Sequence, residues 1–131
     1  MTLAHALVVA AGLALSASAY AQDAAALAQQ DASIIDSLRE ISTDLSKPHQ
    51  VDFYFTFKAE ASAKAASQAM TQQGYTEVDL SPSPGDGLWQ LQVQRTLVPE
   101  LKGMNAASQA LAAIARHHGG DYDGWSAIPP E

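Results

Sequence analysis

An unbroken alternation of apolar and polar side chains runs through Val51-Asp52-Phe53-Tyr54-Phe55-Thr56-Phe57-Lys58. A period of two places Val51 and the phenylalanines on one face of a β-strand and the polar residues on the other. All three phenylalanines of the chain lie in this stretch. Because so large an aromatic area on one face has to be buried, the stretch predicts a strand whose phenylalanine face belongs to the core.

Helix and strand patterns alternate on the C-terminal side of this strand. Residues 59–73 predict a helix that ends at Gly74, with an inner face of small residues and one methionine: Ala61, Ala65, Ala66, Ala69 and Met70. Residues 75–80 predict a second strand. A loop rich in proline, serine and glycine follows at residues 81–87. Residues 88–97 predict a third strand, with Trp89, Leu91, Val93 and Leu97 on one face and Gln90, Gln92 and Gln94 on the other.

The last part of the chain predicts one more helix and one more strand. Residues 99–103 contain proline and glycine and predict a break, after which Asn105 can cap a helix that runs to His118. Its expected buried stripe is Ala107, Leu111, Ile114 and Ala115. Gly119-Gly120 ends the helix, and residues 121–125 supply a short final strand.

Apolar residues at spacings of three and four predict a further helix before the phenylalanine strand; they are Ile34, Ile35, Leu38, Ile41 and Leu45. Asp31 or Ser33 can cap its start, and Lys47-Pro48 ends it. Residues 22–30 are rich in alanine and glutamine and are expected to form a flexible arm.

Residues 1–21 differ from the rest of the chain because they contain no Asp, Glu, Lys or Arg. An apolar run is followed by Ala19-Tyr20-Ala21, which fits the small-residue pattern before a signal-peptidase cleavage site. The segment predicts a signal peptide at 1–21 and a periplasmic or secreted mature protein. After cleavage no membrane segment is expected.

The order of elements after the first helix is strand, helix, strand, strand, helix, strand. This order predicts an α+β fold, a ferredoxin-like βαββαβ sandwich with a four-stranded antiparallel sheet and an extra N-terminal helix, over residues 31–128. Two helices would cover the phenylalanine face of the sheet. The face that carries Tyr54 and the glutamines would stay open unless the N-terminal helix covers it.

Charge and composition exclude several classes of function. The chain has 7 basic and 14 acidic residues, a net charge of −7 and no cysteine. An acidic surface repels phosphate backbones, so no nucleic-acid partner is expected, even though related sandwiches bind RNA on their open face. The chain contains no nucleophile motif or phosphate loop, so no catalytic residues and no cofactor are predicted.

The stretch Asp121-Tyr122-Asp123-Gly124-Trp125 is the candidate binding site. His117, His118, Asp121 and Asp123 could suggest a metal site, but adjacent helical histidines point about 100° apart and the spacing lacks the further ligands of a calcium loop. No metal is therefore predicted. A structural interpretation makes Asp123-Gly124 a bulge or turn, with Tyr122 and Trp125 closing one end of the core. The alternative is an edge that binds a protein partner.

Several motifs resemble the regulator of ribonuclease E activity B family. They are KPHQVDFYFTF (47–57), GY (74–75), WQLQV (89–93) with TLVP (96–99), and HHGGDYDGW (117–125), of which residues 119–125 are the most specific. The resemblance covers residues 31–127. It implies an α+β sandwich and a non-enzymatic, acidic, cytoplasmic protein that binds ribonuclease E and inhibits it.

An exported protein cannot meet a cytoplasmic nuclease, so the signal peptide and the resemblance lead to different functions. The first hypothesis is an exported, non-enzymatic domain that binds an unidentified protein. The second is a cytoplasmic inhibitor of ribonuclease E, if the N-terminal segment is not a working signal. The third is a small periplasmic hydrolase or ligand-binding protein that uses the open sheet face.

Overall fold

The computed structural model describes residues 24–41 and 44–129. The predicted signal peptide lies outside the described residues. After an N-terminal helix, described over residues 24–41, the elements are β1 (His49–Phe57), α2 (Glu60–Gln72), β2 (Thr76–Pro82), β3 (Trp89–Leu97), α3 (Leu101–His117) and β4 (Gly120–Ile128). Within these two ranges, no helix combines the length and the hydropathy needed to cross a membrane.

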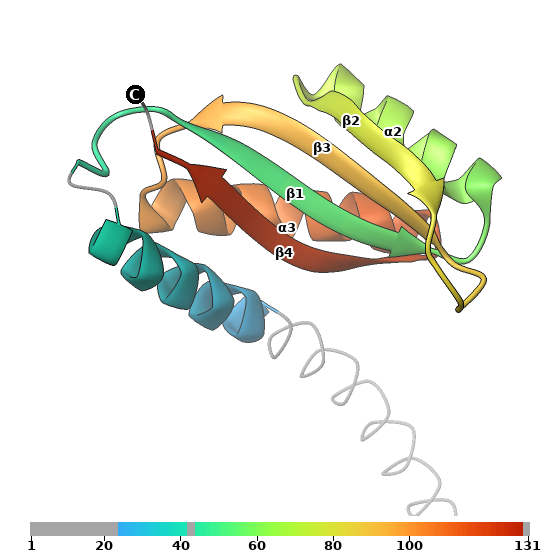
Figure 1. The fold of residues 1–131 in the computed structure, drawn as a ribbon, viewed down its shortest axis with the longest axis horizontal. Coiled ribbons are helices and arrows are strands. Elements are labelled where there is room, and N and C mark those ends of the chain that lie inside the picture. The colour runs from blue at the N-terminus through green and yellow to red at the C-terminus, as the bar shows by residue number, and fades with distance from the viewer. Residues whose placement is uncertain (1–23, 42–43, 130–131) are drawn as a thin grey trace, which may run out of the picture.

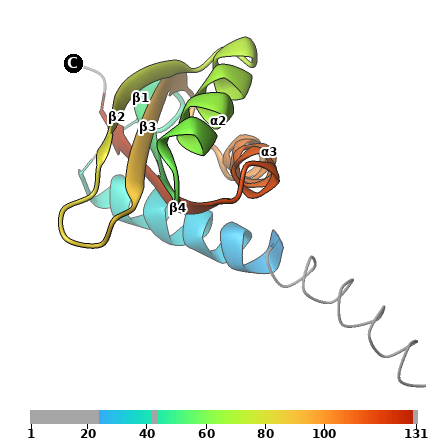
Figure 2. The ribbon, with the colours of Figure 1, turned by 90° about the vertical axis from the view of Figure 1, so that its right-hand side faces the viewer.

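The four strands form one antiparallel sheet in the order β2-β3-β1-β4 (Figure 1). This is the strand order of a ferredoxin-like βαββαβ sandwich, so the predicted fold class is confirmed. β1 lies in the middle, where Phe53 pairs with Val93 of β3 and Trp125 of β4. Figure 2 shows α2 and α3 on one face of the sheet and the N-terminal helix across its β4 edge. No described helix therefore covers the opposite face.

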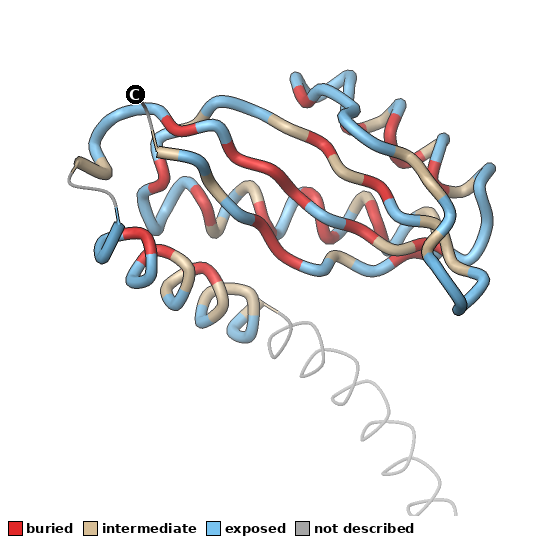
Figure 3. Tube along the Cα trace, in the orientation of Figure 1, coloured by how far each residue is buried: buried red, intermediate tan, exposed pale blue. Residues whose placement is uncertain are grey.

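The core follows the phenylalanine stripe of β1. Phe53, Phe55 and Phe57 are at most 1% exposed, and Val51 is fully buried. In Figure 3 the buried residues gather along the central strands and the inward sides of the helices. Burial of each phenylalanine contributes about 2 kcal/mol of hydrophobic free energy. The predicted faces of β1 and β3 are thus confirmed, since Leu91 and Val93 are buried as well.

The N-terminal helix starts earlier than the sequence predicts. Residues 24–30, expected to form an arm, continue directly into residues 31–41 as one helix. Asp31 therefore does not cap a helix start; it lies within the helix and is fully buried. Ile35 and Leu38 of the expected stripe are buried, but Ile41 is 70% exposed, so the predicted stripe is only partly confirmed.

The predicted inner face of α2 is partly wrong. Its buried residues are Ala63, Ala66, Ser67 and Met70, whereas Ala61 is exposed and Ala65 and Ala69 are half-buried. The buried Ser67 hydroxyl donates a hydrogen bond of 2.7 Å to Oε1 of Glu77 on β2. This bond satisfies the hydroxyl group, whose burial the helical pattern of apolar residues did not predict. Gly74 adopts a φ of 99° and ends the helical segment as predicted.

The α3 helix begins at Leu101, whereas Asn105 as the predicted N-cap would have placed its first residue at position 106. Pro99 does not break it because it lies before the N-cap residue Glu100, outside the helix, and Gly103 in the first turn costs only about 1 kcal/mol relative to alanine. Met104, Ser108 and Ala112 join Leu111 and Ala115 on the buried face, while Ala107 and Ile114 are partly buried. β2 and β4 also extend beyond their predicted ends, to Pro82 and Ile128, because pairing with their neighbours continues there.

Candidate functional site

The predicted site, Asp121 to Trp125, lies in the middle of β4 and contains a β-bulge. Tyr54 of β1 pairs with Gly124, but the next residue, Phe55, pairs with Tyr122, so Asp123 is the extra residue. Gly124 has a φ of 119°, a conformation that favours glycine. The interpretation of Asp123-Gly124 as a bulge is confirmed.

The bulge sends the two aromatic side chains of the site to the same face. In a regular strand, residues three apart point to opposite faces, but the extra residue turns Trp125 to the side of Tyr122. The Tyr122 ring lies 5.3 Å from the Phe55 ring and 6.5 Å from the Phe53 ring, and Trp125 is only 5% exposed. Both aromatics therefore close the core, as the structural interpretation predicts.

The two carboxylates of the site point the other way. Asp121 pairs with Thr56 across the strands, and the Thr56 hydroxyl donates a hydrogen bond to the Asp123 carboxylate. Both aspartates are exposed. The five residues thus do not form one surface: the acids face solvent and the aromatics face the interior. Whether a partner binds them stays a prediction.

Beneath the site lies a cluster that the sequence did not reveal, formed by Asp31, Ser108, Tyr122 and Trp125; we call it the buried polar cluster. Oδ1 of Asp31 accepts hydrogen bonds of 2.8 Å from the Ser108 hydroxyl and from Nε1 of Trp125. The Tyr122 hydroxyl lies 3.1 Å from the Ser108 oxygen. Since Ser108 gives its only proton to Asp31, Tyr122 is the donor in that contact. The cluster joins the N-terminal helix, α3 and β4.

Burial changes the ionisation of two members of the cluster. The pKa of Asp31 is raised above its ordinary value of 3.8 because burial disfavours the carboxylate, although the hydrogen bonds from Trp125 and Ser108 act in the opposite direction. Its Oδ2 has no hydrogen-bond partner among the described residues. Burial also raises the pKa of Tyr122, so its hydroxyl keeps the proton that it donates.

One signal in the sequence could have identified Asp31 as a buried residue. Asp31, Ile35 and Leu38 are spaced four and three residues apart, so they share one face of the helix. Because Asp31 was interpreted as the N-cap of the helix, it was not counted among the residues of that face. Its partners Ser108 and Trp125 lie 77 and 94 positions away, and no local pattern connects them.

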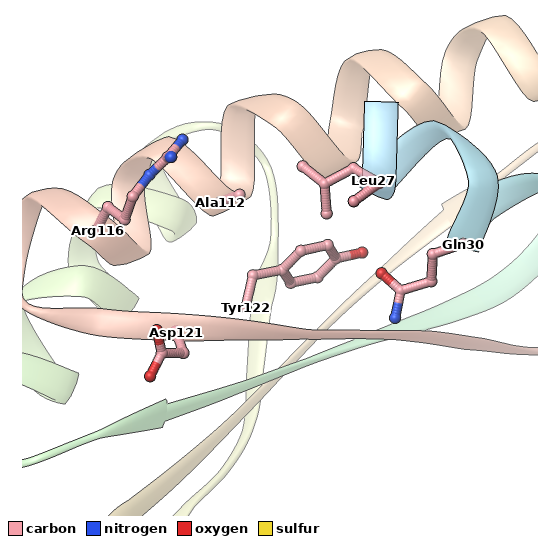
Figure 4. Close-up of a pocket in the computed structure, with 7 residues that line it drawn as sticks. Leu27, Gln30, Ala112, Arg116, Asp121 and Tyr122 are labelled. Atoms are coloured by element: carbon pink, nitrogen blue, oxygen red, sulfur yellow. The ribbon is translucent and has the colours of Figure 1, made fainter. Parts of the chain in front are cut away.

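A groove of about 410 Å³ opens beside the cluster, between the N-terminal helix, α3 and β4. Figure 4 shows Tyr122 pointing into it between Leu27 and Ala112, with Gln30 at one side. Asp121 also lines the groove, but its carboxylate points to the other side of β4 in the same view. Gln30 also donates from Nε2 to the backbone oxygen of Asp123 at 3.4 Å, which ties the N-terminal helix to the bulge.

The metal alternative finds no support in this geometry. In the part of the chain that the structure describes, no group of three or more His, Cys, Asp or Glu side chains could hold a metal ion. The His117 and His118 rings lie 5.0 Å apart at 87°, a packed edge-to-face pair. The backbone N–H of His118, not its imidazole, caps the end of α3 by bonding to the preceding carbonyl groups.

Strand order and helix placement define a ferredoxin-like α+β domain. In its candidate site the two aromatic side chains belong to the core, and the two carboxylates face solvent. The chain belongs to the Regulator of ribonuclease activity B family, whose profile matches residues 28–127. The resemblance inferred from the sequence is thereby confirmed. The matched range begins inside the N-terminal helix, before Asp31. No curated protein matched the chain in a sequence search.

Proposed function

We propose that this chain is a non-enzymatic regulator that acts on a ribonuclease, with ribonuclease E as the first candidate, by direct protein contact. The observation that carries the proposal is the family match over residues 28–127, which spans the sandwich except for the last residue of β4. The family is one of regulators. A protein without a catalytic role changes an enzyme's rate by binding the enzyme or its substrate, so the surface of this domain is its functional part.

The acidic character of the chain supports a protein target over a nucleic-acid target. A net charge of −7 opposes binding to the RNA substrate, so competition for RNA does not explain regulation. The same charge favours encounter with a basic surface of an enzyme.

The compartment decides which target is available. The export prediction rests on residues 1–21 alone, outside the described residues. Membership of a ribonuclease-regulator family favours the cytoplasmic alternative, because a regulator has to share a compartment with its target. Cell fractionation combined with N-terminal sequencing separates the two. A cytosolic chain that begins at Met1 agrees with the ribonuclease proposal, whereas a periplasmic chain that begins at Gln22 requires an extracytoplasmic partner.

The activity itself is tested with purified components. Ribonuclease E is mixed with the full chain, and cleavage of a fluorogenic RNA is followed at increasing concentrations of the chain. The proposal expects co-purification of the two proteins and a saturable decrease in the cleavage rate. An unrelated acidic protein of similar size is the control for charge alone. Absence of both co-purification and a rate change would reject ribonuclease E as the target.

A further inference from the structure

One face of the sheet carries no helix of the described chain (Figure 2). It consists of the even-numbered positions of β1 and β3 with their pairing partners on β2 and β4, together with the bulge residue Asp123; we call it the open sheet face. Most side chains here are polar, with Gln90, Gln92 and Gln94 in a row along β3, and Ile128 at the end of β4 is an exposed apolar exception. A face of this kind stays soluble without a cover and remains available to a partner.

The charges at the strand positions of the open sheet face have one sign, and Lys58 lies just beyond the end of β1. Its carboxylates are Asp52 on β1, Asp79 on β2, and Asp121 and Asp123 on β4. No strand position on this face holds Lys or Arg; Arg95 of β3 points to the helix side, where it lies over the Tyr75 ring. The two ion pairs among the described residues, Arg39–Asp36 and Lys64–Glu60, involve none of these aspartates. The face therefore presents a negative field that no strand residue neutralises.

Hydrogen bonds hold the side chains of the open sheet face in place. Gln92 and Gln94 donate from Nε2 to Oδ1 of Asp52 at 3.1 and 3.0 Å. These bonds hold the Asp52 carboxylate at the centre of the face, where it is only 5% exposed. Ser81 donates to Asp79 at 2.8 Å in the same way on β2. Preorganised side chains lose little conformational entropy when a partner binds.

An aromatic ring stands in the middle of this field. Tyr54 is 38% exposed, and its hydroxyl is held 3.0 Å from the Ser126 oxygen. Its pairing partner on β4 is Gly124, which places no side chain against the ring. Exposed tyrosines that are already oriented are frequent anchors of protein interfaces, and a ring surrounded by carboxylates suits the stacking of a guanidinium group.

We infer that the open sheet face is the surface on which this regulator binds its target, and that it takes a Lys- and Arg-bearing segment of a protein. The inference rests on the proposed function and assigns a surface and a partner chemistry to it. A second copy of the chain is a poor occupant, because two copies would oppose the same carboxylates. RNA is a poor occupant for the same electrostatic reason, since its phosphates are anionic.

The test uses two variants on the face and one matched control away from it. Asp121→Lys reverses an exposed charge on the face, and Tyr54→Ala removes the ring. Glu40→Lys makes the same change in net charge at an exposed position of the N-terminal helix. Binding of the full chain to ribonuclease E and to a synthetic oligoarginine peptide is measured by titration calorimetry at two salt concentrations. Oligoglutamate and oligouridine are the control probes, and circular dichroism checks that each variant is folded.

The expected result is a loss of affinity of about tenfold or more for ribonuclease E and for oligoarginine in both face variants, with Glu40→Lys within about threefold of the unmodified chain. If ribonuclease E binds all four chains alike, the surface is wrong while the proposed function stands. If ribonuclease E does not bind but oligoarginine binds through Tyr54 and Asp121, the proposed function fails while the surface stands. Absence of binding to both probes, or binding of oligouridine at this face, overturns the inference.

Discussion

Nε1 of Trp125 donates a hydrogen bond of 2.8 Å to Oδ1 of Asp31, although the two residues lie 94 positions apart. The bond joins the last strand to the N-terminal helix inside the domain, where neither residue is more than 5% exposed. A buried indole N–H needs an acceptor, and the helix supplies it as a carboxylate rather than as a backbone group. Docking of the N-terminal helix therefore depends on a polar contact as well as on Ile35 and Leu38.

Replacement of Asp31 tests the value of this contact. Asp31→Ala removes the shared acceptor and leaves the Trp125 N–H buried without a partner, so the free energy of unfolding should fall by about 2–3 kcal/mol. Asp31→Asn keeps an acceptor oxygen and should cost less than about 1 kcal/mol. Urea unfolding followed by tryptophan fluorescence measures both values. The control is Asp36→Ala on the exposed side of the same helix, expected within about 0.5 kcal/mol of the unmodified chain. Equal losses of unfolding free energy for Asp31→Ala and Asp31→Asn would show that the acceptor oxygen for the Trp125 N–H does not contribute to stability.

The ionisation of Asp31 predicts a specific pH dependence. Its pKa is raised above 3.8 by burial, so the folded state binds this proton more tightly than the unfolded chain does. Its contribution to stability is fully present below 3.8 and is lost as the pH rises through the raised pKa. Asp31→Asn cannot titrate, so the stability of the unmodified chain relative to this variant should decrease as the pH rises from about 4 to about 7. Urea unfolding at several pH values gives the difference, and parallel profiles would contradict the assignment.

The bulge predicts that Gly124 is hard to replace. A Cβ at this position would lie 2.8 Å from Nε2 of Gln30, and the φ of 119° is far from the conformations that alanine adopts. Gly124→Ala should cost about 1–3 kcal/mol of unfolding free energy, mainly from backbone strain. Gly85→Ala is the matched control: its φ is 83°, but it lies in a loop with nothing within 4 Å of the added Cβ. Thermal unfolding should show a smaller loss for Gly85→Ala, and the reverse order would contradict the role of the bulge.

Neighbouring residues of β1 test the assignment of its two faces. Phe55 is 1% exposed, and Phe55→Ala should destabilise the domain by about 3–5 kcal/mol through the lost burial and the cavity left behind. Tyr54 points to the open sheet face, so Tyr54→Ala should cost about 1 kcal/mol or less. Chemical denaturation of the two variants measures both effects. A melting temperature unaffected by Phe55→Ala would mean that the strand faces are reversed.

Much of the fold could be predicted because it depends on neighbours in the chain. Alternation in β1 and β3 assigned their buried faces, since successive side chains of a strand point to opposite sides. Gly74 and Gly119-Gly120 indicated where helical segments end, and Asp123-Gly124 indicated a bulge. Boundaries were less predictable: α3 starts at Leu101 because Pro99 lies before its N-cap Glu100 and a single glycine at position 103 is not enough to end a helix.

The sequence by itself determined the order of the elements, the phenylalanine core and the family motif at residues 119–125, because each is a local pattern of side chains. Only the tertiary structure decided what those residues do. The bulge brought Tyr122 and Trp125 to one face, and the N-terminal helix brought Asp31 beneath them. The same arrangement left Asp121 and Asp123 on the opposite, uncovered face. These contacts join residues that are distant in the chain, so they depend on how the helices pack against the sheet, which no local periodicity encodes.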